Sequence, residues 1–417
     1  MKQVRHSKHK RMNILYIAYS CSPYQGSEDK IGWSVPFESA KTNKVFVITK
    51  TEQKEDIDRY FESNSIKNIE FYYVDIPNIC KKVFRGSLYS GRLNVWNRRA
   101  LSVARQICEK NKIDVVHQIT PVEFRAIGNY DRLPDVKFVC GPLGGAEQIP
   151  TGLKSYAKGQ RLVEGIRALT NQASGVSIRM GKKLQRCDHV MFANYETCAF
   201  LQGDKSSADV VSEIAIDPPK KPKSRKPGIS RMTFLVAGRL IYRKGHAFLL
   251  DALEQLPEGL DYECRILGTG PEWSKLVDRC NASPKLSKHV VFVGAVPYVT
   301  MEKEYEAADV FIMPSIRETT GTVLLEAMSK GVPVITLNKF GGALLLDEAC
   351  GWLIDGTDRE TFVTTMAQAL EACIASPEEV YRKGLNAQLK SEQFTWERKS
   401  LYYQAIYDRV LTNENEA

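Results

Sequence analysis

The stretch DVFIMPSIRETTGTVLLEAMSKGVPVITL, residues 309–337, predicts a strand, a helix and a second strand in that order. The apolar β-rich run DVFIMPS is ended by Pro314 and Ser315. Thr320, Gly321 and Thr322 then open a helix that runs through LLEAMSKG, and VPVITL follows as a strand. Strands that alternate with helices are typical of a parallel sheet.

The same alternation extends through most of the chain. The first half contains the β-rich runs NILYIAY, KVFVIT, IEFYYVDI, DVVHQI, VKFVCGP and HVMFAN, with amphipathic stretches between them. Residues 216–230, IDPPKKPKSRKPGIS, are rich in proline and in Lys and Arg, so we interpret them as a linker. After it come MTFLVAG, YECRILG, VVFVGAV, DVFIMPS, VPVITL and GWLI. The sequence therefore predicts two doubly wound α/β domains facing a cleft, with ligands at the carboxyl ends of the strands.

Composition excludes several classes of protein. The 417 residues are too many for one core, and 43% hydrophobic with 26% charged residues is ordinary for a globular protein. No apolar run approaches the roughly 20 residues that span a bilayer. The basic N-terminus leads into a short apolar run that is typical of a first strand, not of a signal peptide. Ten cysteines without paired spacing predict reduced thiols in a cytoplasmic protein and no metal site.

The net charge of +9 favours anionic partners. Nucleic acid is the least favoured of them, because no helix carries a dense array of Arg and Lys, so no nucleic-acid partner is expected. A phosphorylated substrate or an acidic lipid surface fits better.

Two cations follow the first strand of the second half, in VAGRLIYRKGH. Arg239 and Lys244 lie five residues apart, with Gly238 and Gly245 beside them. Cations at the carboxyl end of a strand can bind a diphosphate and neutralise the charge of a leaving group. The alternative is a solvated basic loop.

Two glutamates accompany the helix of the opening stretch. Glu318 precedes that helix near its positive end, and Glu326 lies about one turn inside it. Carboxylates are good acceptors for the vicinal hydroxyls of a sugar or a ribose, and the amides of Gly321 and Thr322 would face an anion. Alternatively, Glu318 only complements the helix dipole and Glu326 is a solvated helical residue.

Three further turns give weaker signals. SPYQGSEDKIGW places Gly26 and Ser27 between a strand and a helix, where an anion is favoured. ILGTGPEW contains Gly268, and the backbone near Val296 in VVFVGAVPY could bond a flat base. Dinucleotide-binding and P-loop motifs are absent from the sequence.

Taken together, GRLxxxKG, GxGP, FxG, PSxxE and the E-x7-E pair that closes in EAMSKGVPVI resemble the GT-B glycosyltransferases of family 4. The resemblance runs from Met232 to about Val410, and it is looser in the first half, in GSE-x-x-x-GW, DVVHQITPVEFR and GPLGGAEQIP. It implies two Rossmann-like domains, residues 1–217 with a returning helix at about 395–417, and residues 218–394. It also implies a retaining transferase with a nucleotide diphosphate-sugar donor, a UDP- or GDP-sugar, and no obligatory metal or other cofactor.

The resemblance also implies roles for individual residues. Arg239 and Lys244 would bind the donor diphosphate, Glu318 the sugar hydroxyls and Glu326 the ribose; Glu318, Arg239 and Lys244 form the expected catalytic set. The expected donor-binding set is Gly26, Ser27, Gly238, Arg239, Lys244, Gly268, Val296, Glu318, Thr320, Gly321, Thr322 and Glu326.

One departure from the family concerns the acceptor side. Many relatives carry His-x-His where this chain has His117 and Ile119, so the task of the second histidine passes to another group. Thr120, Glu123 and the GPLGG turn are the candidates. The expected acceptor-side set is His117, Thr120, Glu123, Arg125, Gly144 and Glu147.

We expect a glycosyltransferase that moves a sugar to a hydroxyl acceptor, a lipid-linked glycan of bacterial polysaccharide synthesis. A soluble or protein-linked glycan acceptor is the alternative within that class. A sugar-nucleotide-binding protein without catalysis would keep the same motifs. A glycan phosphorylase is a third alternative, although no lysine motif for a pyridoxal cofactor is present.

Residues 79–106, ICKKVFRGSLYSGRLNVWNRRALSVARQ, suggest a surface that docks on the inner face of the cell membrane. They contain no acid, and their cations and apolar residues are interleaved. The apolar set comprises Val83, Phe84, Leu88, Tyr89, Leu93 and Trp96. The alternative is a helix packed on its own sheet with solvated cations.

Overall fold

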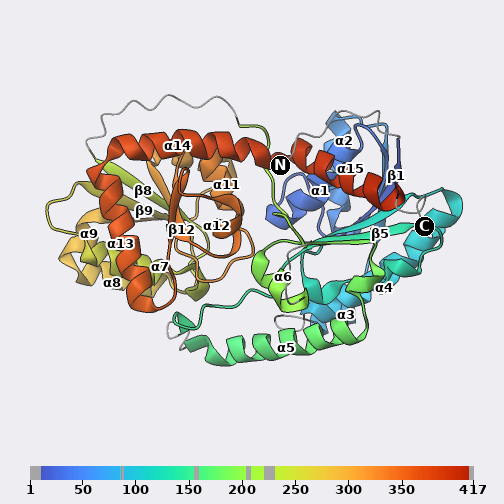
Figure 1. Ribbon diagram of the computed structural model, residues 1–417, viewed down its shortest axis with the longest axis horizontal. Helices are drawn as coiled ribbons and strands as arrows, with labels where there is room; N and C mark the ends of the chain where they lie inside the picture. Colours follow the sequence, from blue (N-terminus) through green and yellow to red (C-terminus); the bar gives the residue numbers. More distant parts are fainter. Residues whose placement is uncertain are drawn as a thin grey trace.

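A computed structural model describes residues 11–84, 86, 89–154, 159–202, 208–219 and 231–412. Two parallel sheets lie side by side in it, each flanked by helices (Figure 1). The fold class is the one that the sequence predicts. The basic N-terminal residues 1–10 and most of the expected linker, residues 220–230, lie outside the described residues.

The first sheet has seven strands in the order β3-β2-β1-β4-β5-β6-β7. Its strands are β1 (Asn13–Ala18), β2 (Lys44–Lys50), β3 (Ile69–Val74), β4 (Val115–Thr120), β5 (Lys137–Leu143), β6 (His189–Phe192) and β7 (Asp209–Val210). Its helices are α1 (Ser27–Ser39), α2 (Lys54–Ser63), α3 (Asn78–Val83), α4 (Tyr89–Lys110), α5 (Arg161–Met180) and α6 (Tyr195–Gln202). The short β7 and the long α5 were not expected from the sequence.

The second sheet has six strands in the order β10-β9-β8-β11-β12-β13. Its strands are β8 (Met232–Ala237), β9 (Tyr262–Leu267), β10 (Val290–Gly294), β11 (Val310–Met313), β12 (Val334–Leu337) and β13 (Gly351–Ile354). Its helices are α7 (His246–Gln255), α8 (Trp273–Ala282), α9 (Pro284–His289), α10 (Tyr298–Ala307), α11 (Thr322–Ser329), α12 (Phe340–Leu345), α13 (Arg359–Ala375) and α14 (Pro377–Ser391).

Alternate residues of the central strands bury against opposite layers of helices. In β1, Tyr16 joins the cluster that includes residues of α1, whereas Leu15 joins the one that includes residues of α4. In β8, Phe234 packs with residues of α7 and α13, and Leu235 with residues of α11. Burial on both faces explains why these strands read as continuous apolar runs.

Helix α15 (Trp396–Thr412) returns from the second sheet and packs on the first (Figure 1). The hydroxyl of Tyr407 lies 2.6 Å from Nδ1 of His117 in β4, and its bond to the Tyr16 hydroxyl is 3.2 Å long. Gln404 accepts a 2.8 Å bond from Asn43. The main chain crosses between the sheets twice, and the two crossing segments lie side by side. Ile216 of the first exchanges backbone hydrogen bonds with Phe394 and Trp396 of the second.

The proposed membrane stretch, residues 79–106, is divided between surface and core. Leu93 and Trp96 are buried, and the indole of Trp96 donates to the carbonyl of Val74, so the expectation that these two face a membrane is wrong. Their burial follows from the helical spacing, which turns them toward the first sheet. Val83 and Tyr89 are exposed, at 57% and 42%, and Arg85 and Leu88 lie outside the described residues. Within those residues, no helix is long and apolar enough to cross a membrane.

Candidate functional site

The strands β8 and β11 are neighbours and run parallel, although they are far apart in the sequence. Phe234 pairs with Val310, and Leu235 with Phe311. The strand order reverses between these two strands, and that is where a doubly wound sheet binds ligands. The Arg239–Lys244 turn and the loop of Glu318 therefore leave the same edge of the sheet.

A row of three glycines ends β8, β9 and β10 at this edge. Gly238, Gly268 and Gly294 have φ of 152°, 125° and 87°. A Cβ on Gly268 would lie 2.0 Å from the carbonyl oxygen of Gly238, and the amide of Gly268 donates to the carbonyl of Gly294 at 2.7 Å. The row gives the site a floor of main chain, which a ligand can approach closely.

Lys244 and Glu318 meet in an ion pair between Nζ and Oε2. Arg243 Nη1 lies 3.8 Å from the other carboxylate oxygen. Burial alone would raise the pKa of Glu318, but the charges of Lys244 and Arg243 outweigh burial and the pKa is lowered. Among the described residues, the cations in contact with Glu318 are thus Lys244 and Arg243; Arg239 is exposed at the end of β8.

The two loops are held together by main-chain contacts. Gly245 has a φ of 72°, and a Cβ there would lie 1.9 Å from the carbonyl oxygen of Pro314. The amide of Ile316 donates to the carbonyl of Arg243 at 2.9 Å. A basic turn of ordinary sequence, with a side chain at position 245, would be forced away from Glu318.

Helix α11 begins at the predicted place. Gly321 caps it with a φ of 90°, and Thr322 is its first residue. Thr320 is buried and its hydroxyl donates to Glu213, a contact that the sequence did not predict. Glu326 is half-buried and accepts a 2.8 Å hydrogen bond from the hydroxyl of Tyr305. The two predicted glutamates therefore differ, since Glu318 is held by cations and Glu326 by a phenol.

The first domain contacts the Glu318 loop directly. Asn194 Nδ2 donates to the carbonyl of Thr319 at 3.1 Å and to Glu147 Oε1 at 2.7 Å. A Cβ on Gly144 would lie 2.6 Å from Cγ2 of Thr319. Glu147 is 2% exposed, and burial raises its pKa against the hydrogen bonds that it accepts. Two residues of the expected acceptor-side set, Gly144 and Glu147, thus lie beside the Glu318 loop. Asn194 was not predicted, because no motif marks it.

Other acceptor-side residues have structural partners. His117 is fully buried between Tyr407 and the carbonyl of Gly141, and burial lowers its pKa to about 3, so its assignment to the acceptor side is corrected. Thr120 is buried as well and exchanges hydrogen bonds with the backbone of Ser20, which corrects its assignment too. Both side chains point into the packing of β4 instead of the cleft.

Glu123 and Arg125 form a bidentate pair, with distances of 2.9 Å to Nε and 2.6 Å to Nη2. A Cβ on Gly145 would lie 2.8 Å from Glu123 Oε1, so this pair lies against the GPLGG turn, and two of the candidates for the task of the missing histidine are neighbours. The pair stays half-buried.

Gly26 and Ser27 begin α1, and both are exposed. A Cβ on Gly26 would meet no atom within 4 Å. Glu28, which follows them, accepts a 2.9 Å hydrogen bond from the amide of Val122, so the loops after β1 and β4 are tied together. Val296 is half-buried in the turn after β10.

Two buried ionisable residues, Glu213 and Lys399, lie where the chain crosses between domains, and Glu213 contacts Thr320. Glu213 is 5% exposed, and burial raises its pKa to about 7. Lys399 of α15 is 7% exposed and donates to the carbonyl of Ser212; burial lowers its pKa to about 8. No sequence motif marks either residue.

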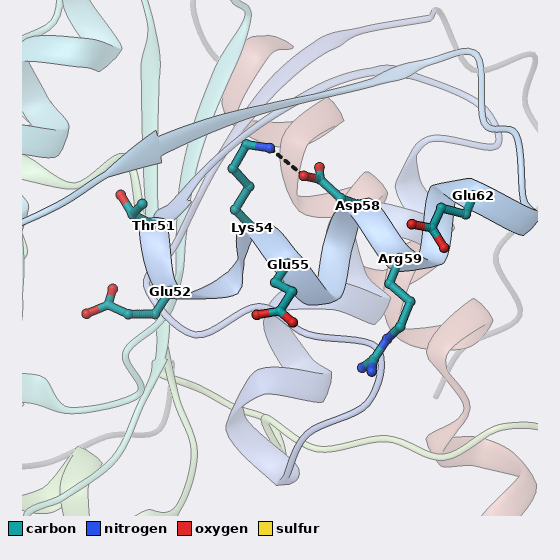
Figure 2. A pocket seen from close by; sticks show the side chains of 7 residues that line it. All are labelled: Thr51, Glu52, Lys54, Glu55, Asp58, Arg59 and Glu62. Atoms are coloured by element: carbon teal, nitrogen blue, oxygen red, sulfur yellow. Dashed lines mark hydrogen bonds and ion pairs between the residues drawn. The ribbon is translucent and has the colours of Figure 1, made fainter.

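Two of the surface hollows differ in how well they are placed to bind a substrate. One of about 570 Å³ lies along η1 (Thr51–Gln53) and α2, whose charged side chains, including the Lys54–Asp58 pair, project from one short segment (Figure 2). The other, about 440 Å³, lies between the Glu147 loop and α5, and its lining includes Glu147, Lys154, Arg161, Glu164 and Arg167. The second is the better candidate for an acceptor because Glu147 also belongs to the contacts at the donor loop. In the described part of the chain, no cluster of three His, Cys, Asp or Glu side chains suits a metal ion, and all ten cysteines are free.

This architecture defines the class: the protein has the GT-B fold of the glycosyltransferases. Residues 219–384 match the family model described as "Glycosyl transferases group 1". Sucrose-phosphate synthase from Thermosynechococcus elongatus has a similar structure, with a TM-score of 0.65 and 17% identity over 97% of this chain and 100% of that one. HepE of Anabaena, solved with UDP and glucose, has a TM-score of 0.61 and 16% identity over 95% of this chain and 99% of that one.

Curated relatives match over part of the chain. An uncharacterized glycosyltransferase of Methanocaldococcus jannaschii is 31% identical over 177 residues, 36% of this chain and 45% of that protein. The putative colanic acid biosynthesis glycosyltransferase WcaL of Salmonella typhimurium is 28% identical over 184 residues, 40% of this chain and 45% of that protein. Each alignment thus spans a little under half of the relative.

We predict that Glu213→Gln flattens the pH dependence of stability. A pKa of about 7 in the fold, against an ordinary 4.5, means that the native carboxyl keeps its proton while the unfolded one loses it. The contribution of this group to the free energy of unfolding is fully present below pH 4.5. It falls by about 3 kcal/mol as the pH rises to 7. Urea unfolding at pH 4.5 and 7 should show a loss that is larger in the wild type than in the variant, because Glu147 and other buried acids remain in both. An equal loss in both proteins would contradict the assignment.

Proposed function

We propose that this protein is a retaining glycosyltransferase that moves a sugar from a nucleotide diphosphate-sugar to a hydroxyl group of a glycan. The observation that carries the proposal is the meeting of Lys244 and Glu318 over a glycine floor, where the strand order reverses. The match of residues 219–384 to a glycosyltransferase family model supports it.

In this proposal the Arg239–Lys244 turn binds the donor diphosphate. Lys244 and Arg239 contact its oxygens, and Lys244 exchanges part of its contact with Glu318 for the phosphate. The amides at the start of α11 add donors, which favour an anion at a helix N-terminus. As the bond between sugar C1 and the phosphate oxygen breaks, these groups stabilise the charge that develops on the leaving group. Arg243, already 3.8 Å from Glu318, keeps that carboxylate ionised.

The two carboxylates, Glu318 and Glu326, bind different parts of the donor. Glu318 accepts hydrogen bonds from hydroxyls of the transferred sugar, and Glu326, positioned by Tyr305, accepts them from the ribose. The main chain at Val296 bonds the base, and the main chain at Gly26 approaches the diphosphate from the first domain. For retention, the acceptor oxygen bonds to C1 on the face that the phosphate leaves, and the acceptor proton goes to a phosphate oxygen.

The acceptor enters through the hollow between α5 and the Glu147 loop, close to the Glu123–Arg125 pair. We propose a lipid-linked glycan of bacterial polysaccharide synthesis, on the cytoplasmic face of the cell membrane. The name of the Salmonella relative, a putative colanic acid biosynthesis glycosyltransferase, supports this choice. A UDP-sugar is the first donor to test, because HepE was solved with UDP-glucose.

The test is a thermal-shift panel of UDP-, GDP- and ADP-sugars, followed by product analysis. A true donor at about 100 times its dissociation constant should stabilise the fold by about 2.7 kcal/mol. Slow release of free sugar from that donor without acceptor would support catalysis. Stabilisation with no turnover would favour a binding protein, and no stabilisation by any nucleotide sugar would contradict the proposal.

We predict that Arg239→Ala and Lys244→Ala each lower kcat/KM by roughly a hundredfold or more, the scale for losing one preorganised charge-stabilising donor. Steady-state kinetics with the donor from the panel measure this. Lys330→Ala is the matched control, because Lys330 pairs with Glu302 away from the Glu318 loop. Near-normal turnover in both site variants would remove them from the donor site.

We predict that Glu318→Gln lowers kcat more than Glu326→Gln. Glu318 would contact the reacting sugar, whereas Glu326 would hold the distant ribose and so act chiefly on KM. Both changes keep the side-chain volume, and melting curves check that the fold is intact. A larger loss of kcat in Glu326→Gln would reverse the two assignments.

A further inference from the structure

Helix α5 exposes a stripe of large apolar side chains. Leu162, Leu169 and Met180 are 78%, 72% and 80% exposed, and Ile166 and Val176 are exposed as well. Residues 162, 166, 169, 176 and 180 are spaced by three, four or seven residues, so they lie on one face of the helix. We call these five residues the α5 stripe. The helix lies along the lower edge of the molecule in Figure 1.

The opposite face of α5, which meets the protein, contains few large apolar side chains: its buried residues are Asn171, Gly175 and Ile178. Arg167 donates to the carbonyl of Gly145 at 2.7 Å, and Asn171, 1% exposed, donates to the same carbonyl at 3.3 Å. Two hollows of about 440 Å³ lie along this helix, one lined by residues 161–171 and one by residues 173–178. A helix on the surface of a water-soluble domain normally has the reverse pattern, with its apolar face inward.

The exposed charges on and next to α5 are mostly positive. Arg161, Arg179, Lys182 and Arg186 are exposed, Arg167 faces inward, and the one acid of residues 159–187 is Glu164. Glu164 forms an ion pair with Arg317 and accepts a hydrogen bond from Tyr242, so its charge is balanced within the molecule. The surface that carries the apolar stripe is therefore cationic.

We propose that the α5 stripe docks this protein on an anionic lipid surface. An amphipathic helix that lies in the plane of a membrane has an apolar face in the acyl boundary and cations beside it, which matches α5. A second copy of the chain fits less well, because two α5 segments with the same excess of cations would repel each other. The buried part of the stretch at residues 79–106 plays no part in this docking.

The docking would place the cleft at the membrane. Glu164, in the first turn of α5, holds Arg317 and Tyr242, and these are the sequence neighbours of Glu318 and of Arg243. The polar face of the same helix lines the proposed acceptor hollow. An acceptor attached to a lipid would then reach the hollow without leaving the membrane. This last step rests on the proposed function, whereas the docking itself does not.

The experiment is co-sedimentation with vesicles of phosphatidylcholine, alone or mixed with phosphatidylglycerol, at low and moderate salt. The test variant is the full chain with Leu162→Gln, Leu169→Gln and Met180→Gln, whose exposed positions should leave the fold intact. A matched control changes Leu385, Leu389 and Leu401 to Gln; these residues are 38%, 63% and 49% exposed on α14 and α15. A third protein carries Ile79→Gln and Val83→Gln, at exposed positions of α3.

We expect the wild type and the α14–α15 control to pellet with the anionic vesicles, and more salt to weaken that binding. The α5 variant should partition at least about tenfold less, because it lacks three exposed apolar side chains that the membrane would bury. Equal binding of the α5 variant and the wild type, or no binding of the wild type, would overturn the proposal. Loss of binding in the α3 variant alone would assign the docking to α3 and overturn it as well.

Two further measurements separate the possible failures. Sedimentation velocity without lipid asks whether the wild type forms a dimer that the α5 variant does not; such a dimer would assign the stripe to a second copy and overturn membrane docking. The nucleotide-sugar panel is repeated on the α5 variant. Donor stabilisation that persists while vesicle binding is lost supports a separate docking surface. Vesicle binding without any donor stabilisation would leave the docking standing and contradict the transferase.

Discussion

The close approach of Gly245 to the carbonyl of Pro314 is the contact on which the second domain's site depends. It is possible only without a side chain and with a positive φ, which glycine adopts at no steric cost. Because of this contact, the turn after β8 and the loop after β11 pack directly against each other. Arg243 and Lys244 then meet Glu318, and the next residue back, Arg317, reaches across to Glu164 of α5. One backbone contact thus sets both the ion pairs of the Glu318 loop and its link to the first domain.

The carboxylates around the cleft differ in their electrostatic environment. Glu318 is flanked by cations, and its pKa is lowered despite burial. Burial dominates at Glu147 and Glu213, and their pKa values are raised. The second domain therefore keeps an ionised acid that is paired with cations. The first domain and the crossing segment hold acids that keep their protons more readily. The two walls of the cleft are in contact through Asn194 and Thr319.

Much of the fold could be predicted because buried parallel strands have a clear pattern. The β-rich runs of both halves became strands, and α11 starts at Thr322 as its glycine and threonines indicate. The ion pair of Lys244 with Glu318 joins residues that two separate motifs had marked. The sequence could not reveal Glu213 or Asn194, because each acts through a contact between distant segments. Helix α5 was missed for another reason: its apolar residues have an ordinary helical spacing, but the sequence alone does not show that this face is exposed. His117 matched a family position, but its imidazole is buried against the phenol of Tyr407 in the returning helix.

The packing of α15 on the first sheet also has a consequence for the order in which the chain can fold during synthesis. Tyr16, His117 and Tyr407 form one buried cluster, yet Tyr407 is translated long after the seven strands of that sheet. The emerging first domain must wait, with one face uncovered, until residues 396–412 have left the ribosome. The second domain is made in between and can fold earlier. Chaperone binding to the nascent chain would therefore be expected on the α15-facing side of the first sheet, and a premature stop before residue 396 would leave the first domain incomplete although its own sequence is intact.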